Sequence, residues 1–283
     1  MTPQSKAEQG ENTVKEAVNK KQYTEKCYLD TYRVDQNKIG KASGIWQLMQ
    51  ESACHQMENQ KPSYSDLLDE GKALMLARVD LAIPEGVFLD ESLTASSWPC
   101  ESTRATFLRN YTLTEGDRIV AIADTQWSLV DTQSRKILKV SDADFSNYWM
   151  GEHRLLIKDK FKITKETAQF MHTVGSKTVS YSDLDYNGHM NNTYYLDVLC
   201  DFIPELAAGT HRVSFVRIHY SKEAPLGDCL KVIATDAIPV SDADAKEYGV
   251  PAEIKYIFKT EKADGELNVE AEIVLTKISP KIT

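Results

Sequence analysis

An internal repeat constrains the fold of this chain more than any other feature of its sequence. The segment TYRVDQNKIGKASGIWQLMQESA, from Thr31, aligns with SYSDLDYNGHMNNTYYLDVLCDF, from Ser180, after a shift of 150 residues. Under that shift three pairs of positions coincide: Asp35 with Asp185, Asn37 with Asn187, and Ile39 with His189. At 283 residues the chain is long enough for two domains. We therefore expect two structurally similar halves.

Each half carries the pattern of one helix followed by several long strands. Apolar residues spaced i, i+3, i+4 and i+7 or i+8 predict a helix with one buried face. These positions are Ile45, Leu48, Met49 and Ala53 in the first half, and Tyr195, Val198, Leu199 and Phe202 in the second. The β-rich runs are LMLARVDLAI, SLTASSW, ATFLRNYTL and IVAIADTQWSLV, then VSFVRIHYSK, CLKVIAT, EIKYIFK and VEAEIVL. The pattern predicts an α+β fold in which a helix lies on an antiparallel sheet.

The repeat and the local composition divide the chain into four segments. Residues 1–20 are polar and are expected to form a mobile tail. They contain neither an apolar core nor an arginine, so neither a signal peptide nor a transit peptide is predicted. Residues 21–150 form the first expected domain and residues 171–283 the second. Residues 151–170, rich in Lys and Glu, are expected to be a linker or a short helix that crosses the sheet.

Charge and cysteine content exclude several classes of protein. A formal net charge of −9 disfavours binding to nucleic acid. The chain has no apolar run of about eighteen residues, so no membrane span is predicted. The five cysteines are odd in number and form no C-x-x-C pair, which argues against a disulfide framework or a zinc site. A reducing cytoplasm fits this content.

The stretch DLDYNGHMNN, residues 183–192, is the most informative part of the sequence. Its opening resembles a calcium-binding loop, but the twelfth position, which needs a bidentate Glu, is Tyr194. Asp, Asn and Gly are also ordinary turn and helix-cap residues. His189 adds a titratable group at the expected helix entrance, where main-chain N–H groups point outward. That addition favours a functional site over a simple turn.

The second half resembles the acyl-acyl-carrier-protein (acyl-ACP) thioesterases of plants and bacteria. The family segment D-x-N-x-H-[VM]-N-N-x-x-Y is matched from Asp185 to Tyr195. SFVRIHYSKEAPLGD, residues 214–228, is similar to the family's strand that ends in Tyr, two polar residues and Glu before a Gly-Asp turn. The resemblance spans roughly residues 21–278. It implies a tandem (double) hot-dog fold, with two antiparallel sheets each wrapped around or packed on a central helix.

The resemblance also assigns catalytic roles. It makes Asp185, Asn187, His189 and Glu223 the catalytic residues and implies neither a metal nor a cofactor. Thioester hydrolysis needs a base for water and donors for the developing oxyanion. Either Glu223 or His189 fits the role of base, and the main-chain N–H groups of Asn191 and Asn192 are the expected oxyanion donors.

Two positions depart from the plant pattern. Plant members commonly carry Cys where this chain has Ala224, so a Cys–His mechanism at that position is excluded. Asp201 stands where they carry Glu, and is assigned a supporting role. Cys200 is expected to be a core thiol rather than an alternative nucleophile.

The remaining expectations concern substrate binding. The first half carries Ile39 in place of the histidine, and the resemblance makes that half the acyl-chain cavity. Candidate lining residues are Trp46, Met49 and Leu76, for which ordinary core packing is the alternative. A carrier protein is acidic, so docking requires a basic patch, for which the candidates are Arg212, Arg217 and Lys222.

The expected reaction releases free fatty acid from an acyl chain on the phosphopantetheine arm of acyl carrier protein. An acyl-CoA thioesterase and a non-catalytic acyl-thioester-binding protein are the alternatives. Either a monomer or a homodimer is compatible with two hot-dog halves in one chain.

Overall fold

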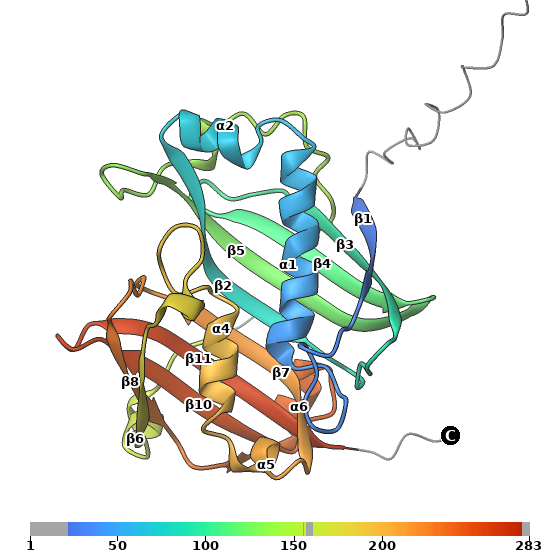
Figure 1. Cartoon of the computed structure of the whole chain (residues 1–283), viewed down its shortest axis with the longest axis vertical. Coiled ribbons are helices and arrows are strands. Elements are labelled where there is room, and N and C mark those ends of the chain that lie inside the picture. The colour runs from blue at the N-terminus through green and yellow to red at the C-terminus, as the bar shows by residue number, and fades with distance from the viewer. Residues whose placement is uncertain (1–21, 155, 157–160, 279–283) are drawn as a thin grey trace, which may run out of the picture.

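The computed structural model describes residues 22–154, 156 and 161–278 (Figure 1). The expected tail, residues 1–20, lies outside the described residues, as does part of the expected linker. The first half contains β1 (Tyr23–Tyr28), α1 (Ala42–Glu58), α2 (Tyr64–Asp69), β2 (Lys72–Ala82), β3 (Ser92–Cys100), β4 (Phe107–Glu115), β5 (Arg118–Asp131) and the 3-10 turn η1 (Val140–Asp142).

The second half begins with α3 (Lys165–Ala168), a single helical turn within the expected linker. It continues with β6 (His172–Thr178), the 3-10 turn η2 (Tyr181–Asp183), α4 (Tyr194–Cys200), α5 (Pro204–Ala207), β7 (His211–Tyr220), β8 (Cys229–Ala234), β9 (Ile238–Pro239), α6 (Asp242–Tyr248), β10 (Ile254–Glu261) and β11 (Leu267–Lys277). The predicted strands and the two predicted central helices are therefore confirmed, except that Phe202, expected on the face of the second helix, lies beyond the end of α4.

One continuous antiparallel sheet runs through both halves. Its order is β1-β3-β4-β5-β2-β7-β11-β10-β8-β6, with β9 paired to β10. Read inward from its outer edge, each half contributes its first, third, fourth, fifth and second long strand. The two sheets expected from the sequence are thus joined edge to edge, where β2 pairs with β7 and Asp80 lies opposite Arg217. The repeat seen in the sequence is a repeat of topology.

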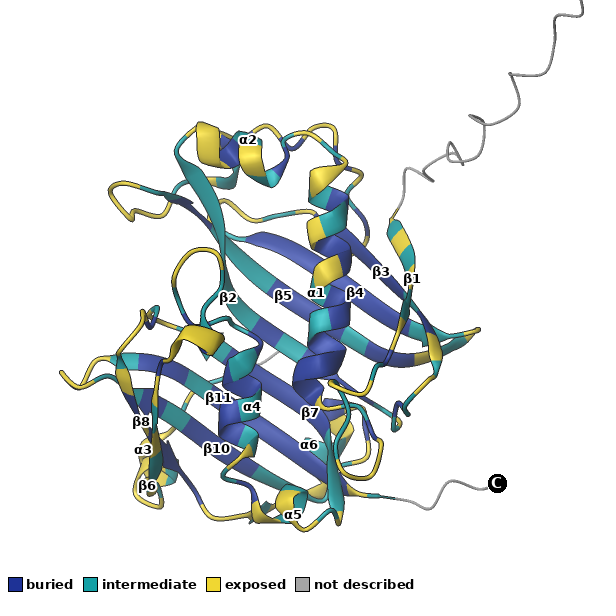
Figure 2. Ribbon diagram, in the orientation of Figure 1, coloured by how far each residue is buried: buried dark blue, intermediate teal, exposed yellow. Residues whose placement is uncertain are grey.

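Both central helices lie on the same face of this sheet (Figure 1). The predicted apolar positions of α1 are all buried, and so are Tyr195, Val198 and Leu199 of α4 (Figure 2). Gly44 lets α1 approach the preceding loop, because a Cβ there would lie 2.5 Å from the Cβ of Arg33. Among the described residues, no helix combines the length and apolarity that a membrane crossing requires.

A row of polar residues, all buried except the half-buried Asp80, crosses five neighbouring strands, from β4 to β11. In register it reads Asn110, Asp124, Asp80, Arg217 and Glu272. Each carboxylate has a basic side chain near it: the imidazole of His153 at 2.8 Å from Asp124, Arg217 at 3.4 Å from Asp80, and Lys255 at 3.2 Å from Glu272. We name this row the polar row. Its centre lies at the β2–β7 junction, so it ties the two halves together.

The polar row gives stability a pH dependence. Burial raises the pKa of Asp80 to about 7, against the opposing effect of Arg217. Because this pKa exceeds the unfolded value of about 4, the folded state binds more protons between these pH values, and stability falls as pH rises through them. We expect the urea midpoint to fall from about pH 5 to about pH 8, and to fall less in Asp80→Asn. If the urea midpoint fell equally with pH in the wild type and in Asp80→Asn, the pH dependence could not be assigned to Asp80.

Candidate active site

The motif before α4 folds into a tight turn that is built around the carboxylate of Asp185. Its Oδ1 accepts hydrogen bonds from the main-chain N–H of Asn187 at 2.8 Å and of His189 at 3.3 Å. The N–H of Asp185 donates to the carbonyl of His189 at 2.9 Å. Gly188 has a φ of 78°, which favours glycine. Asp185 therefore shapes the turn that presents Asn187 and His189.

The first half contains the same turn without the histidine. The Oδ1 of Asp35 accepts from the N–H of Asn37 at 2.8 Å and of Ile39 at 3.0 Å. Lys38, with a φ of 61°, stands where the second half has Gly188. The same turn therefore forms with and without a histidine, and in both halves the Asp carboxylate organises its main chain.

Glu223 reaches His189 from the loop that follows β7. A β-bridge pairs His189 with Pro225, and the N–H of Met190 donates to the carbonyl of Ala224 at 2.8 Å. These main-chain contacts place Glu223 Oε2 at 3.3 Å from His189 Nε2. Both side chains are 28% exposed, which leaves them open to a substrate. The structure thus brings together the imidazole and carboxylate that the sequence singled out.

The position in the first half that is equivalent to Glu223 is Gly86. There the N–H of Gly40 donates to the carbonyl of Val87 at 2.7 Å, just as Met190 does to Ala224. Ile39 forms the matching bridge to Phe88. Glycine therefore replaces Glu223, and isoleucine replaces His189. The first half lacks both groups, although the sequence alone revealed only the loss of the histidine.

Two cations beside Glu223 were missed by the sequence analysis. The guanidinium of Arg135, in the loop after β5, forms an ion pair with Glu223 Oε2. Lys262, after β10, donates to the main-chain carbonyl of Glu223 at 3.2 Å and pairs with Asp228 at 2.7 Å. Among the described residues no hydrogen bond or ion pair engages Glu223 Oε1. The polar turn that holds Arg135 gives no sequence signal of a partner in the other half.

One of the two expected oxyanion donors is wrong. The N–H of Asn191 already donates to the carbonyl of Asp183 at 2.8 Å, so it is not available to a substrate. The side-chain oxygen of Asn192 accepts from Trp46 Nε1 at 3.4 Å, and its carbonyl accepts from the Tyr220 hydroxyl at 2.8 Å. Its N–H has no acceptor in the part of the chain that is described. Asn192 alone remains as a main-chain donor.

The expected support from Asp201 is not seen. Asp201 lies exposed at the end of α4 opposite to the motif, and its N–H donates to the carbonyl of Asp197. Partial burial and the charge of Asp197 raise the pKa of Asp201. Within the described ranges it makes no contact with His189 or Glu223, since the length of α4 separates them. Burial also raises the pKa of the Cys200 thiol far above its usual range, so this cysteine is unsuited to nucleophilic attack.

Two of the three residues expected to form the carrier-docking patch are engaged within the protein. Arg212 donates to the carbonyls of Ile83 at 2.9 Å and Pro84 at 2.8 Å, and burial lowers its pKa. Arg217 is buried in the polar row. Lys222 is exposed, but pairs with Glu266 at 2.9 Å. Both arginines bind groups within the protein, and residue type alone does not reveal these partners.

The expected acyl-pocket residues all belong to the main core. Trp46 and Met49 are fully buried, and Leu76 packs against the same cluster. The Trp46 ring meets Tyr111 edge-on, with centroids 5.2 Å apart. Core packing, the alternative named for these residues, describes their present contacts.

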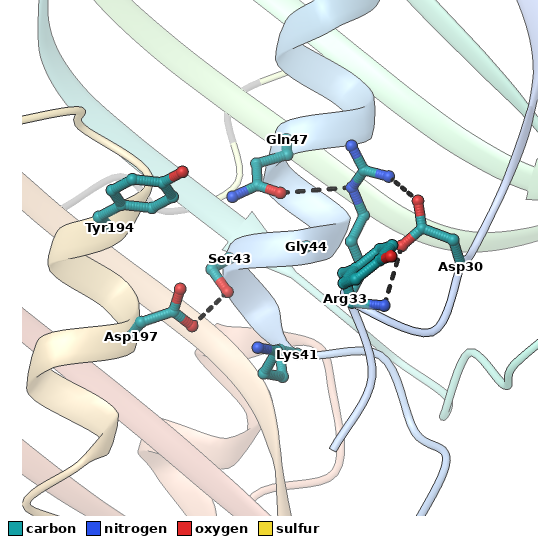
Figure 3. A pocket seen from close by; sticks show the side chains of 9 residues that line it. Asp30, Arg33, Lys41, Ser43, Gly44, Gln47, Tyr194 and Asp197 are labelled. Carbon is teal, nitrogen blue, oxygen red and sulfur yellow. Dashed lines mark hydrogen bonds and ion pairs between the residues drawn. The ribbon is translucent and has the colours of Figure 1, made fainter. Parts of the chain in front are cut away.

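A polar cavity of about 330 Å³ lies between the start of α1 and α4 (Figure 3). Its lining includes Ser43, whose hydroxyl donates to Asp197 at 2.5 Å, and Gln47, whose amide donates to Thr193 at 3.2 Å. These bonds join the two central helices. The cavity is lined by charged and polar groups, so it does not suit an acyl chain.

The C-terminal half, which contains Asp185, His189 and Glu223, matches a known protein family. A sequence model of the acyl-ACP thioesterase C-terminal domain matches residues 164–277. The C-terminal half is therefore similar to the C-terminal domain of the acyl-ACP thioesterases over residues 164–277. The resemblance carried by the motif from Asp185 to Tyr195 is thereby confirmed.

Curated relatives of the family extend the likeness into the first half. Oleoyl-acyl carrier protein thioesterase 2 of Arabidopsis thaliana is 22% identical over 233 residues, covering 77% of this chain. The dodecanoyl-[acyl-carrier-protein] hydrolase of Cinnamomum camphora is 30% identical over 79 residues, or 28% of this chain and 20% of the relative. This chain spans 64% of the length of the Arabidopsis relative, slightly less than two thirds.

Solved structures of family members share the fold. An acyl-ACP thioesterase of Bacteroides thetaiotaomicron superposes with a TM-score of 0.76 at 19% identity, covering 91% of this chain and 98% of its own. The 12:0-ACP thioesterase of Umbellularia californica gives 0.75 at 15% identity, covering 91% and 94%. The tandem hot-dog fold expected from the sequence is confirmed.

Proposed function

We propose that this chain hydrolyses the thioester of acyl-ACP, releasing free fatty acid and carrier protein. The observation that carries the proposal is the contact of Glu223 with His189, in the half that matches the acyl-ACP thioesterase C-terminal domain. We assign the chemistry to residues 171–283 and acyl binding to residues 21–150, with residues 151–170 as the connection.

The Glu223–His189 pair acts as the base in this scheme. Water attacks the thioester carbonyl carbon, and its proton passes to the pair as the C–O bond forms. The main-chain N–H of Asn192 donates to the oxyanion, and the Asn187 amide orients the water or the thioester. The C–S bond then breaks, and the same proton passes to the departing thiolate. Asp185 holds the turn in place throughout.

Comparing two substrates tests the proposal. We expect the wild-type protein to release free thiol from acyl-ACP with a higher kcat/KM than from the CoA ester of the same acyl chain, measured with a thiol reagent. Equal or better turnover of the CoA ester would identify an acyl-CoA thioesterase instead. Tight acyl-ACP binding without thiol release would identify an acyl-binding protein and contradict the proposal.

The cysteines support a proposal for the compartment. All five are free thiols. We propose that the protein works in a reducing compartment such as the cytoplasm. The oligomeric state that we favour is a monomer, because the β2–β7 pairing already joins two hot-dog sheets within one chain.

A further inference from the structure

Arg135 extends from a rigid loop of the first half toward the site in the second. The loop follows β5, and Asp131 fixes it: its carboxylate accepts from the N–H and hydroxyl of Ser134 at 2.7 and 2.8 Å, and its carbonyl accepts from the Arg135 N–H at 2.9 Å. Arg135 itself has a φ of 60°. The backbone from which the guanidinium extends is therefore well defined.

The guanidinium of Arg135 engages the carboxylate oxygen that faces His189. Glu223 Oε2 accepts the ion pair from Arg135 and lies 3.3 Å from His189 Nε2. A freely exposed Arg–Glu pair is worth about 0–1 kcal/mol and implies no role. The side chain of Arg135 is 52% exposed, but this pair differs because Glu223 is 28% exposed and because the same oxygen contacts the imidazole.

Of the two cations that the described residues place near Glu223, only Arg135 contacts its carboxylate. Lys262 meets the main chain of Glu223, and its charge is paired with Asp228. The negative charges of Asp228, Glu223 and Asp185 add to burial in raising the pKa of Tyr195, at the start of α4, to about 12. Glu223 thus shares this neighbourhood with two other acidic side chains. A cation on the carboxylate offsets their repulsion.

We propose that Arg135 is a positioning residue, supplied by the non-catalytic half, that keeps Oε2 of Glu223 directed at His189. The inference rests on the proposed function, since it concerns the base of that reaction. With Oε2 held by Arg135 and His189, Oε1 is left to accept the proton from water. The first half, which carries Ile39 and Gly86 in place of the catalytic pair, contributes to the site through this arginine.

The test compares pH–rate profiles of three variants on acyl-ACP. Arg135→Met is expected to lower kcat about tenfold or more, because a charge-assisted contact is lost, and to move the acidic limb to higher pH with KM within about twofold. Arg135→Lys should restore the position of the limb and much of kcat. Arg118→Met is the control, because Arg118 pairs with Glu85 and Glu115 at the opposite end of β5. Its removal should change neither kcat nor the pH–rate profile.

Each other result has a definite meaning. Wild-type kcat and an unmoved acidic limb in Arg135→Met overturn the inference while leaving the proposed function intact. A raised KM with unchanged kcat in Arg135→Met also overturns the inference. Arg135 would then bind the phosphate of the phosphopantetheine arm instead of positioning Glu223. An inactive wild-type protein overturns the proposed function, and this inference with it.

Discussion

Replacement of Glu223 by Gln is expected to lower kcat for acyl-ACP hydrolysis by about 10²–10⁴-fold. The amide keeps the size of the side chain but cannot accept the proton of the attacking water. It also leaves His189 Nε2, 3.3 Å away, without an anionic partner. Steady-state kinetics with thiol detection measures the loss. The urea midpoint should stay near that of the wild type, because Glu223 lies outside the core.

Glu266→Gln is the matched control for this substitution. Glu266 is an exposed acid of the same neighbourhood, paired at 2.9 Å with Lys222, the residue before Glu223. Its neutralisation removes one negative charge beside the site without touching His189. We expect kcat within about twofold of the wild type, as for a surface charge. Equal losses in both variants would mean that Glu223 acts only through the local charge.

Replacement of Arg217 by Met is expected to lower the free energy of unfolding by about 3–5 kcal/mol, because it leaves buried charge without its partner. Arg217 is 7% exposed and sits in the polar row between Asp80 and Glu272. Its Nε lies 3.4 Å from the Asp80 carboxylate. Urea unfolding followed by circular dichroism measures the change.

Two further variants interpret that result. Arg118→Met removes an exposed arginine with two acidic partners and should cost about 0–1 kcal/mol. Arg217→Met combined with Asp80→Asn should recover part of the lost stability, because the unpaired carboxylate is gone. A loss in Arg217→Met no larger than in Arg118→Met would mean that the polar row does not hold the halves together.

The sequence predicts the fold well because the fold is repeated. Periodicity identifies a helix face such as that of Ile45 and Met49, and the strand runs follow in the same order in each half. What it does not reveal is how the two sheets meet. The β2–β7 pairing depends on edges that come from distant segments, and no local pattern encodes it. This is why Arg217 was expected on the surface and lies in the sheet.

The candidate site was predictable only where the motif is local. The turn from Asp185 to His189 is formed by consecutive residues, so the sequence shows it directly. Glu223 was identified through the family resemblance. Arg135 was not, because its turn sits in the other half and its partner lies 88 residues away. Asn191 was expected to donate to an oxyanion, but its N–H closes the local turn instead. Hydrogen-bond partners of this kind follow from geometry rather than from residue type.

Thiol release from acyl-ACP by the wild-type protein and by the His189→Ala/Glu223→Ala double variant tests most directly whether the second half carries the chemistry. The two proteins should first be shown to unfold at similar urea concentrations. We predict turnover by the wild type and release close to the uncatalysed rate by the double variant. Turnover by the double variant at the wild-type rate would contradict the account.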